Sequence, residues 1–231
     1  VNYTKDCIRI ITNNVSVDKC NIPSSKNGYG VICRYSAPSI TNSTITTSKY
    51  GIYSDSASPY LYNNELKSGA VGVYMDTNSY GTIFYNSIHN NGGNGIHLES
   101  ASPLIRNNYI YTNGGNGIYV NSSASHIFAN TIYDNDYHGI YFNGNSLANV
   151  DVNKIYNNHG DGIVDYATTT DIMFPTINDN EIYGNVNGIS LTAASPEVYG
   201  NNVHNNTAKG LYAASGSAPT IGPGDVFNNN T

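Results

Sequence analysis

The stretch Ser102–Ile118 reads SPLIRNNYIYTNGGNGI, and its pattern recurs along almost the whole chain. Three short runs of strand-forming residues are separated by a Ser-Pro turn, by paired asparagines and by a glycine-rich turn that ends at Gly117. A glycine followed by an aliphatic residue returns every 21 to 26 residues. These pairs are Gly30-Val31, Gly51-Ile52, Gly72-Val73, Gly95-Ile96, Gly117-Ile118, Gly139-Ile140, Gly162-Ile163, Gly188-Ile189 and Gly210-Leu211.

Two further aliphatic columns keep this period. One column contains Ile22, Ile45, Leu66, Ile88, Ile110, Ile132, Ile155, Ile182, Val203 and Val226. The other contains Ile40, Leu61, Ile83, Ile105, Ile127, Val150, Ile177, Val198 and Ile221. Three strands in so short a repeat leave no room for a helix with its own packed core. We therefore predict an all-β fold, a single-stranded parallel β-helix of about ten coils of 21–26 residues with three short strands per coil, which occupies residues 1–231 as a single domain.

The asparagines follow the same period and are predicted to be structural. Coils stacked about 4.8 Å apart place equivalent side chains in contact. A stacked amide can bond to the free backbone groups of a turn and to the amides above and below it. One column consists of Asn64, Asn86, Asn108, Asn130, Asn153, Asn180 and Asn201. A second consists of Asn91, Asn113, Asn135, Asn158, Asn185, Asn206 and Asn229.

The motif in Ser102–Ile118 resembles the parallel β-helix repeat of the NosD-like and pectate-lyase-like superfamily. The resemblance covers nearly the whole chain and implies a right-handed coil. It also implies a carbohydrate-related role, because that superfamily includes polysaccharide lyases, hydrolases, epimerases, phage tailspikes and surface proteins. Since one fold hosts many activities, the resemblance does not choose among them.

Composition excludes several classes of protein. The chain has 231 residues, a net charge of −6 and only 11% charged residues, but it contains 37 asparagines and 21 tyrosines. Such a composition is unlike a disordered tail, and ten Lys and Arg residues are too few for a nucleic-acid partner. The sequence contains no run of about 18 apolar residues and therefore predicts no membrane span. The start at Val1 shows no secretory leader, and we expect a segment of a longer extracellular or cell-surface chain with flanking domains.

The three cysteines, Cys7, Cys20 and Cys33, lack the spacing of a zinc site. We predict small buried residues, with a disulfide as the alternative.

Strand alternation sorts inward from outward side chains after each repeating glycine. The outward positions carry Tyr74, His97, Tyr119 and Tyr141, beside a column that includes Asp76 and Glu99. We predict that these six residues bind substrate, because sugar C–H faces pack on aromatic rings and polar side chains bond sugar hydroxyls. The alternative is structural, since aromatic pairs also stabilise sheets. Two more outward columns are Tyr111, Tyr133, Tyr156 and Tyr183, and Tyr62, Phe84, Arg106 and Phe128.

The acidic column of Asp55, Asp76 and Glu99 has two interpretations. Carboxylates on successive coils repel one another, so either one pKa rises or a divalent cation such as Ca²⁺ lies between them. A pair of this kind could act as general acid and base in glycoside cleavage. The alternative is an exposed acidic stripe, moderated by solvent and by Arg34.

The candidate catalytic residues lie in two turns of equal length. The alignment predicts that Asp136 stacks on His159 and His138 on Asp161. Asp165 follows, in a slot that other coils fill with Leu or Phe, just before an insertion near residues 167–175. An Asp–His pair can act as a general base or hold a metal, whereas harmless pairing of charges is the alternative.

From these features we predict an extracellular module that contacts polysaccharide through outward ladders, without catalysis and without a resident metal or cofactor. One alternative is a lyase, glycoside hydrolase or epimerase that uses the Asp/His turns. Another is a structural stalk or tail-fibre segment. The GxSxG and HExxH motifs are missing from the sequence, and Arg106 lies on a different face from the acids that a pectate-lyase-type site would require.

Overall fold

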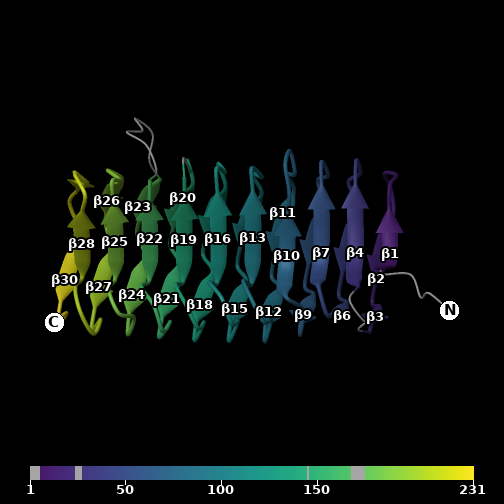
Figure 1. Ribbon diagram of the computed structural model, residues 1–231, viewed down its shortest axis with the longest axis horizontal. Helices are drawn as coiled ribbons and strands as arrows, with labels where there is room; N and C mark the ends of the chain where they lie inside the picture. Colours follow the sequence, from purple (N-terminus) through teal and green to yellow (C-terminus); the bar gives the residue numbers. More distant parts are fainter. Residues whose placement is uncertain (1–5, 24–27, 145, 168–174) are drawn as a thin grey trace.

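The computed structural model describes residues 6–23, 28–144, 146–167 and 175–231. Within these residues the chain forms three ten-stranded parallel sheets, which are the three walls of one solenoid. The coils follow one another along the long axis, from β1 at one end to β28 and β30 at the other (Figure 1). The prediction of an all-β parallel solenoid with about ten coils and three strands per coil is confirmed.

Sheet A faces the viewer in Figure 1, and all of its strands except β1 begin within one residue of the repeating glycine. Its members are β1 (Asp6–Ile10), β4 (Tyr29–Arg34), β7 (Tyr50–Asp55), β10 (Val71–Met75), β13 (Ile96–Glu99), β16 (Ile118–Asn121), β19 (Ile140–Asn143), β22 (Ile163–Tyr166), β25 (Ile189–Thr192) and β28 (Leu211–Ala214).

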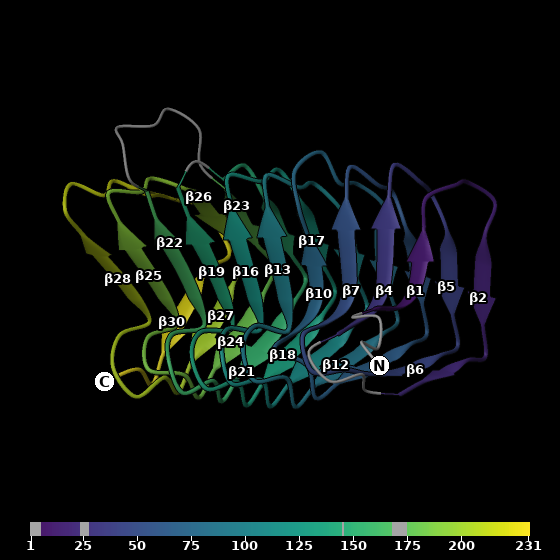
Figure 2. The same ribbon diagram turned by 45° about the vertical axis from the view of Figure 1, so that its right-hand side comes forward.

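Sheet B follows the Ser-Pro turns and forms a second wall, which Figure 2 brings into view. Its members are β2 (Ser16–Asp18), β5 (Ser39–Thr41), β8 (Tyr60–Tyr62), β11 (Thr82–Phe84), β14 (Leu104–Arg106), β17 (His126–Phe128), β20 (Asn149–Asp151), β23 (Thr176–Asn178), β26 (Glu197–Tyr199) and β29 (Thr220–Ile221).

Sheet C is joined to sheet B by a very short turn that contains the first asparagine column. Its members are β3 (Asn21–Ile22), β6 (Thr44–Thr46), β9 (Glu65–Lys67), β12 (Ser87–His89), β15 (Tyr109–Tyr111), β18 (Thr131–Tyr133), β21 (Lys154–Tyr156), β24 (Glu181–Tyr183), β27 (Asn202–His204) and β30 (Val226–Asn228).

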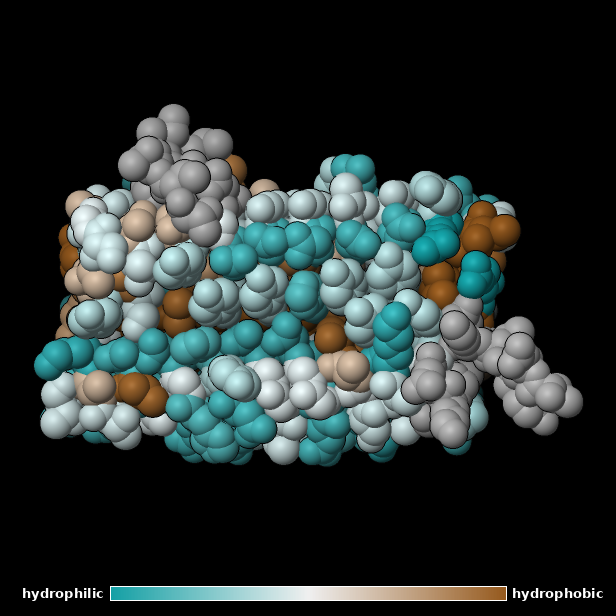
Figure 3. Space-filling view, viewed as in Figure 1, coloured by the Kyte–Doolittle hydropathy of each residue, from teal (hydrophilic) through white to brown (hydrophobic). Residues whose placement is uncertain are grey.

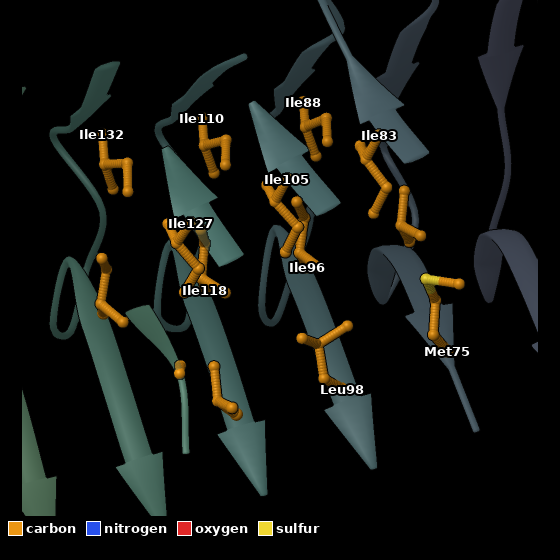
Figure 4. Packing of buried hydrophobic residues seen from close by; sticks show 14 of the residues in the cluster. Met75, Ile83, Ile88, Ile96, Leu98, Ile105, Ile110, Ile118, Ile127 and Ile132 are labelled. Atoms are coloured by element: carbon orange, nitrogen blue, oxygen red, sulfur yellow. The ribbon is translucent and has the colours of Figure 1, made fainter. Parts of the chain in front are cut away.

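The aliphatic columns fill the interior. Ile110 pairs with Ile88 on one side and Ile132 on the other, and all three side chains are fully buried. Figure 4 shows these isoleucines in line along the axis, opposite the core residues of sheet A. The repeating glycine is required by close packing: a Cβ on Gly117 would lie 2.5 Å from Ile132 Cγ2 and 2.7 Å from the Gly139 oxygen.

Both asparagine columns are confirmed as buried hydrogen-bonded ladders. The Asn108 amide donates to the Ile83 and Arg106 carbonyls at 2.9 and 3.0 Å and to Asn130 Oδ1 at 2.9 Å. The backbone N–H of Asn108 donates to the same Asn130 oxygen at 3.0 Å. Each amide therefore satisfies backbone groups of a turn and links two coils in one fixed register.

The last coil differs from the predicted register by one residue. Val203 pairs with Phe227 rather than Val226, and the ladder ends on Asn230 rather than Asn229. The preceding turn contains Pro223 and two glycines, and Asp225 takes the place of an asparagine by accepting the Asn201 N–H at 2.9 Å. The shift follows from the length of this turn, which the sequence columns did not include.

The cysteine prediction is confirmed in part. Cys33 is fully buried and free, and burial raises the pKa of its thiol to about 12. Cys20 is free and half-buried. The side chain of Cys7 and the insertion at residues 168–174 lie outside the described residues.

In the described part of the chain no helix is long and apolar enough to cross a bilayer.

The ladder makes a direct prediction for stability. The substitution Asn108→Ala should lower the free energy of unfolding by about 2–4 kcal/mol, because it leaves buried backbone groups without partners. Asn202→Ala, at an exposed position of β27, is the matched control and should change stability by less than about 0.5 kcal/mol. Urea unfolding followed by circular dichroism measures both. Equal effects would contradict a structural role for the ladder.

Candidate functional site

An aromatic ladder runs along the outer face of sheet A. Successive ring centroids lie 4.5 Å apart for Tyr74 and His97, 4.5 Å for His97 and Tyr119, and 5.6 Å for Tyr119 and Tyr141. The interplanar angles are 18°, 36° and 13°, so the rings face one another along the solenoid axis. Figure 3 shows this face, with rows of hydrophilic residues parallel to the long axis and paler rows between them.

This geometry corrects the predicted mode of sugar contact. In the ladder each ring covers the faces of its neighbours, so a sugar cannot lie flat on an inner ring face. The exposed parts are ring edges, tyrosine hydroxyls and imidazole nitrogens. The face therefore presents a row of hydrogen-bonding groups, one for each coil.

The acidic column beside the ladder is partnered coil by coil. Asp55 lies 3.2 Å from the Arg34 guanidinium. Asp76 accepts the Tyr53 hydroxyl at 2.8 Å and the Thr77 N–H at 2.8 Å. Glu99 accepts the Asn121 amide at 2.6 Å.

The expected rise in a carboxyl pKa does not occur at Asp76. Desolvation by burial acts to raise the pKa of Asp76, but the bonds from Thr77 and Tyr53 outweigh it and hold this pKa below its usual value. Local hydrogen bonds, rather than repulsion between coils, therefore determine the charge of Asp76.

His97 lies in the centre of the ladder as a neutral group. Burial lowers the pKa of His97, and this effect exceeds the attraction of Glu99, whose carboxylate lies 3.6 Å away. Burial also raises the pKa of Tyr74 to about 12, with a further contribution from Asp76. The ladder itself is therefore uncharged at neutral pH, while Asp76 supplies a negative charge at its border.

His138 and Asp161 belong to a third ladder of hydrogen-bonded side chains, which lies beside sheet A. The sequence-based prediction did not include this ladder. The Asn116 side-chain oxygen accepts the backbone N–H of His138 at 3.1 Å. The ring atom Nδ1 of His138 in turn accepts the backbone N–H of Asp161 at 2.9 Å. Asp161 Oδ1 in turn accepts the Asn187 N–H at 2.8 Å. The signal was present in the sequence, because Asn94, Asn116 and Asn187 occupy the same position of their coils.

The third ladder fixes the protonation state of His138. An Nδ1 that accepts a backbone N–H carries no proton, so the neutral ring holds its proton on Nε2. Burial also lowers the pKa of His138, against the attraction of Asp161. The Asp161 carboxylate is itself occupied, since its second oxygen accepts the Ser190 hydroxyl at 2.7 Å. This pair can donate a hydrogen bond from His138 Nε2, but it is not arranged as an Asp-oriented general base.

Asp136 and His159 form the second predicted pair at the surface. His159 Nδ1 lies 3.3 Å from Asp136 Oδ1, and the two side chains are 70% and 59% exposed. His159 also borders a shallow pocket of about 390 Å³ with Asp134, Asn157 and Val186. This imidazole is accessible and has a carboxylate beside it, so it retains the elements of a general base.

The predicted catalytic residues thus form two pairs in adjacent turns and one buried residue. His138 and Asp161 border sheet A, Asp136 and His159 are on the exposed turns, and Asp165 is inside the solenoid between Phe142 and Leu191. Among the described residues no group of three or more His, Cys, Asp or Glu side chains is arranged to hold a metal ion.

Asp165 is buried among apolar residues. Its side chain is almost inaccessible, and its Oδ2 atom has no hydrogen-bond partner in the described part of the chain. Burial raises the pKa of Asp165 to about 7. Ionisation of a carboxyl group in this position lowers the stability of the fold. The group also lies away from the outer face, where a polymer could reach it.

A family model described as "Right handed beta helix region" matches residues 6–146 and 126–226. The chain belongs to this right-handed β-helix family. Comparison with curated protein sequences gives no match.

Solved structures similar to this β-helix include enzymes with three different activities. A double mutant of the periplasmic alginate epimerase AlgG is 19% identical, with a TM-score of 0.66 and coverage of 86% of this chain and 48% of the epimerase. The catalytic unit of a GH87 α-1,3-glucanase from Streptomyces thermodiastaticus strain HF3-3 is 13% identical, with a TM-score of 0.64 and coverage of 93% and 50%. Pectate lyase Pel9A is 14% identical, with a TM-score of 0.53 and coverage of 98% and 66%. The β-helix described here spans about half the length of the first two, and the likeness is one of fold.

Asp165 predicts a pH dependence of stability. Its pKa is higher in the folded chain than in the unfolded chain, so its contribution is fully present below about pH 4 and is lost as the pH rises through about 7. The difference in unfolding free energy between the wild type and Asp165→Asn should therefore change by on the order of 4 kcal/mol between pH 4 and pH 8, in favour of the variant at high pH. The exposed Asp179→Asn serves as the control in urea titrations at both pH values. If the difference in unfolding free energy between the wild type and Asp165→Asn stays constant with pH, Asp165 is not isolated in the core.

The third ladder predicts that an asparagine can replace His138. His138→Asn should keep wild-type stability, because Asn94 and Asn116 fill the same slot and their side-chain oxygens accept the next coil's N–H. His138→Ala should lose about 1–2 kcal/mol, since the Asp161 N–H is left without a partner. Thermal unfolding of the two variants measures this contrast, and equal losses would contradict the ladder role.

Proposed function

We propose that this β-helix binds a neutral, extended polysaccharide along sheet A. The continuous ladder of Tyr74, His97, Tyr119 and Tyr141 is the observation that carries the proposal. It offers one ring edge for each coil, in a straight row, which suits a polymer with a regular repeat. Binding occurs through hydrogen bonds at these edges rather than by stacking on ring faces.

The neighbouring carboxylates determine which polymer fits. Asp76 and Glu99 accept hydrogen bonds from sugar hydroxyls at the border of the ladder, and the tyrosine hydroxyls both donate and accept. The same carboxylates repel uronate groups, so a polymer without carboxylates is favoured on this face. The polysaccharide-related names of the similar structures, an epimerase, a glucanase and a pectate lyase, support the general class of ligand.

Binding without catalysis is favoured by the state of the acidic and basic groups around sheet A. His138 uses Nδ1 to accept a backbone N–H, Asp161 is bonded to Asn187 and Ser190, and Asp165 is buried. We place the protein in an extracellular or periplasmic setting. This assignment rests on the polymeric ligand and on the periplasmic epimerase among the similar structures.

A second candidate function is turnover of a polysaccharide by the exposed turns. Asp136 and His159 favour it, because this imidazole is accessible, is oriented by a carboxylate and borders a pocket. In that case His159 removes the proton on the carbon next to the carboxyl group of a uronate unit, and the adjacent Asp136 stabilises the imidazolium that forms. The electron pair of the broken C–H bond forms a double bond, the bond to the leaving sugar oxygen breaks, and water protonates that oxygen.

Substitutions that remove only hydroxyls test the binding proposal. The triple variant Tyr74→Phe, Tyr119→Phe, Tyr141→Phe keeps every ring and should weaken binding to soluble mannan, xylan or β-glucan by roughly tenfold to a hundredfold, through the loss of up to three hydrogen bonds. Affinity electrophoresis against this panel measures the change.

The matched control is the same change in the tyrosine ladder of sheet C. Tyr111, Tyr133 and Tyr156 stack at 4.9 and 5.0 Å, so their phenylalanine variants remove three hydroxyls from another wall of the solenoid. The control should bind like the wild type. Equal loss in both variants, or no loss on sheet A, would refute the assignment of the binding face. Release of reducing ends or of unsaturated uronates that disappears in His159→Ala would establish the second candidate instead.

A further inference from the structure

An aromatic patch with different geometry covers the outer face of sheet B. It consists of Tyr60, Tyr62, Phe84, Tyr85 and Arg106, and it draws on three consecutive coils. The pairing register places Phe84 between Tyr62 and Arg106. The patch belongs to a different wall of the solenoid from the ladder of sheet A, so a ligand on one face does not compete with a ligand on the other.

The rings of this patch are not stacked into one column. Tyr85 meets Tyr62 edge-on, at an interplanar angle of 86°, and packs against Phe84 at a tilt of 39°. Tyr60 and Tyr85 are 42% and 49% exposed. Tyr60 and Tyr62 are nearly parallel, at an interplanar angle of 11° with ring centroids 6.1 Å apart. Because Tyr60 and Tyr85 are exposed and Tyr85 is tilted against its neighbours, ring surface is open to solvent here, in contrast to the ladder of sheet A. A sugar can therefore pack its C–H face against the patch.

Arg106 places a positive charge in the middle of the rings. Its Cζ atom lies 4.1 Å from the Phe84 ring centroid, a cation–π contact that holds the guanidinium over the ring. The Nε atom is buried and has no hydrogen-bond partner in the described part of the chain. Within the described residues the terminal nitrogens form no hydrogen bond and no ion pair, so they are available to a ligand as a two-pronged donor.

This cation lacks the counter-charge that three other basic residues have. Arg34, Lys67 and Lys154 each lie within 3.2 Å of a carboxylate. Within residues 6–23, 28–144, 146–167 and 175–231, no carboxylate lies at ion-pair distance from Arg106. The nearest acid along its column is Asp151, two coils away, and that carboxylate bonds to His126 at 2.6 Å. In a chain of net charge −6, a cation without a counter-charge beside exposed aromatic rings attracts an anionic group.

We propose that the aromatic patch of sheet B is a second glycan-binding site, specific for carboxylate-bearing sugar units of an acidic polysaccharide. The terminal nitrogens of Arg106 bind the two oxygens of the sugar carboxylate, and Tyr60 and Tyr85 contact the sugar ring. The site goes beyond the proposed function, since sheet A disfavours acidic sugars. Together the two faces let one molecule hold an acidic polymer and a neutral polymer at the same time.

Tyr85 offers a variant that leaves the fold intact. Its backbone is left-handed, with φ of 55°, a conformation that favours asparagine over bulky residues. The neighbouring coils carry Asn63 and Asn107 in the same conformation at the equivalent position. Tyr85→Asn therefore removes the ring without straining the turn.

Calorimetric titration of the whole chain with a galacturonate oligosaccharide tests the proposal. The wild type should bind, and binding should weaken as salt is added. Arg106→Gln should reduce affinity by roughly tenfold to a hundredfold and Tyr85→Asn by roughly threefold to tenfold. Lys154→Gln removes the same charge from sheet C and should leave binding unchanged, as should the phenylalanine variant of the sheet A ladder.

Two further ligands define the chemistry. The methyl ester of the same oligosaccharide lacks the charge and should bind at least tenfold more weakly. A sulfated galactan oligosaccharide should also bind more weakly, because the site is matched to a carboxylate. Absence of binding by the wild type, equal affinity for the ester, tighter binding of the sulfated sugar, or an unchanged affinity in Arg106→Gln would each overturn the proposal. If the phenylalanine variant of the sheet A ladder loses its binding of acidic sugars, the binding site for these sugars is on sheet A instead.

Discussion

The fixed register between successive coils is the constraint on which every other feature depends. Backbone hydrogen bonds hold each strand to its equivalent one coil away, but a parallel stack of short strands needs a further device at its turns, where backbone groups lose their partners. The buried amides supply it. Asn108 and Asn130 join two coils through a side-chain bond of 2.9 Å and a backbone bond of 3.0 Å, and this contact is repeated along the chain. Because the register is fixed, every outward residue type becomes a straight row.

Several titratable groups also serve as hydrogen-bond partners that hold the backbone in place. His138 and Asp161 are a histidine and an aspartate in slots made for asparagine, and each satisfies a backbone N–H of the next coil. Asp76 is likewise held by local donors, so its pKa falls where repulsion between carboxylates alone would raise it. The solenoid thus uses many of its polar groups to join coils. Those that remain for a ligand are ring edges, hydroxyls and a few charges at the borders of the sheets.

The walls of the solenoid differ in the chemistry they offer. Sheet A joins stacked rings to carboxylates, whereas sheet B joins the exposed rings of Tyr60 and Tyr85 to the guanidinium of Arg106, which has no carboxylate partner among the described residues. Stacking determines whether ring edges or ring faces are accessible, and local charge determines whether acidic sugars are repelled or attracted. Both faces run along the same axis, so each of the two proposed sites would follow the length of the solenoid.

The repeat alone determined the fold, the number of coils, the inward and outward faces and both long asparagine ladders, because a period of about 22 residues with three aliphatic columns is satisfied by one kind of stacking. It also paired Asp136 with His159 and His138 with Asp161. It failed in the last coil, where the turn at Gly222–Asp225 shifts the register by one residue and places Asn230 in the ladder. Only the tertiary structure decided that the rings of sheet A hide one another's faces, that His138 holds its proton on Nε2, and that Asp165 is buried with its Oδ2 atom unpartnered among the described residues. These properties depend on the orientation of side chains and on distances between coils, and a one-dimensional pattern contains neither.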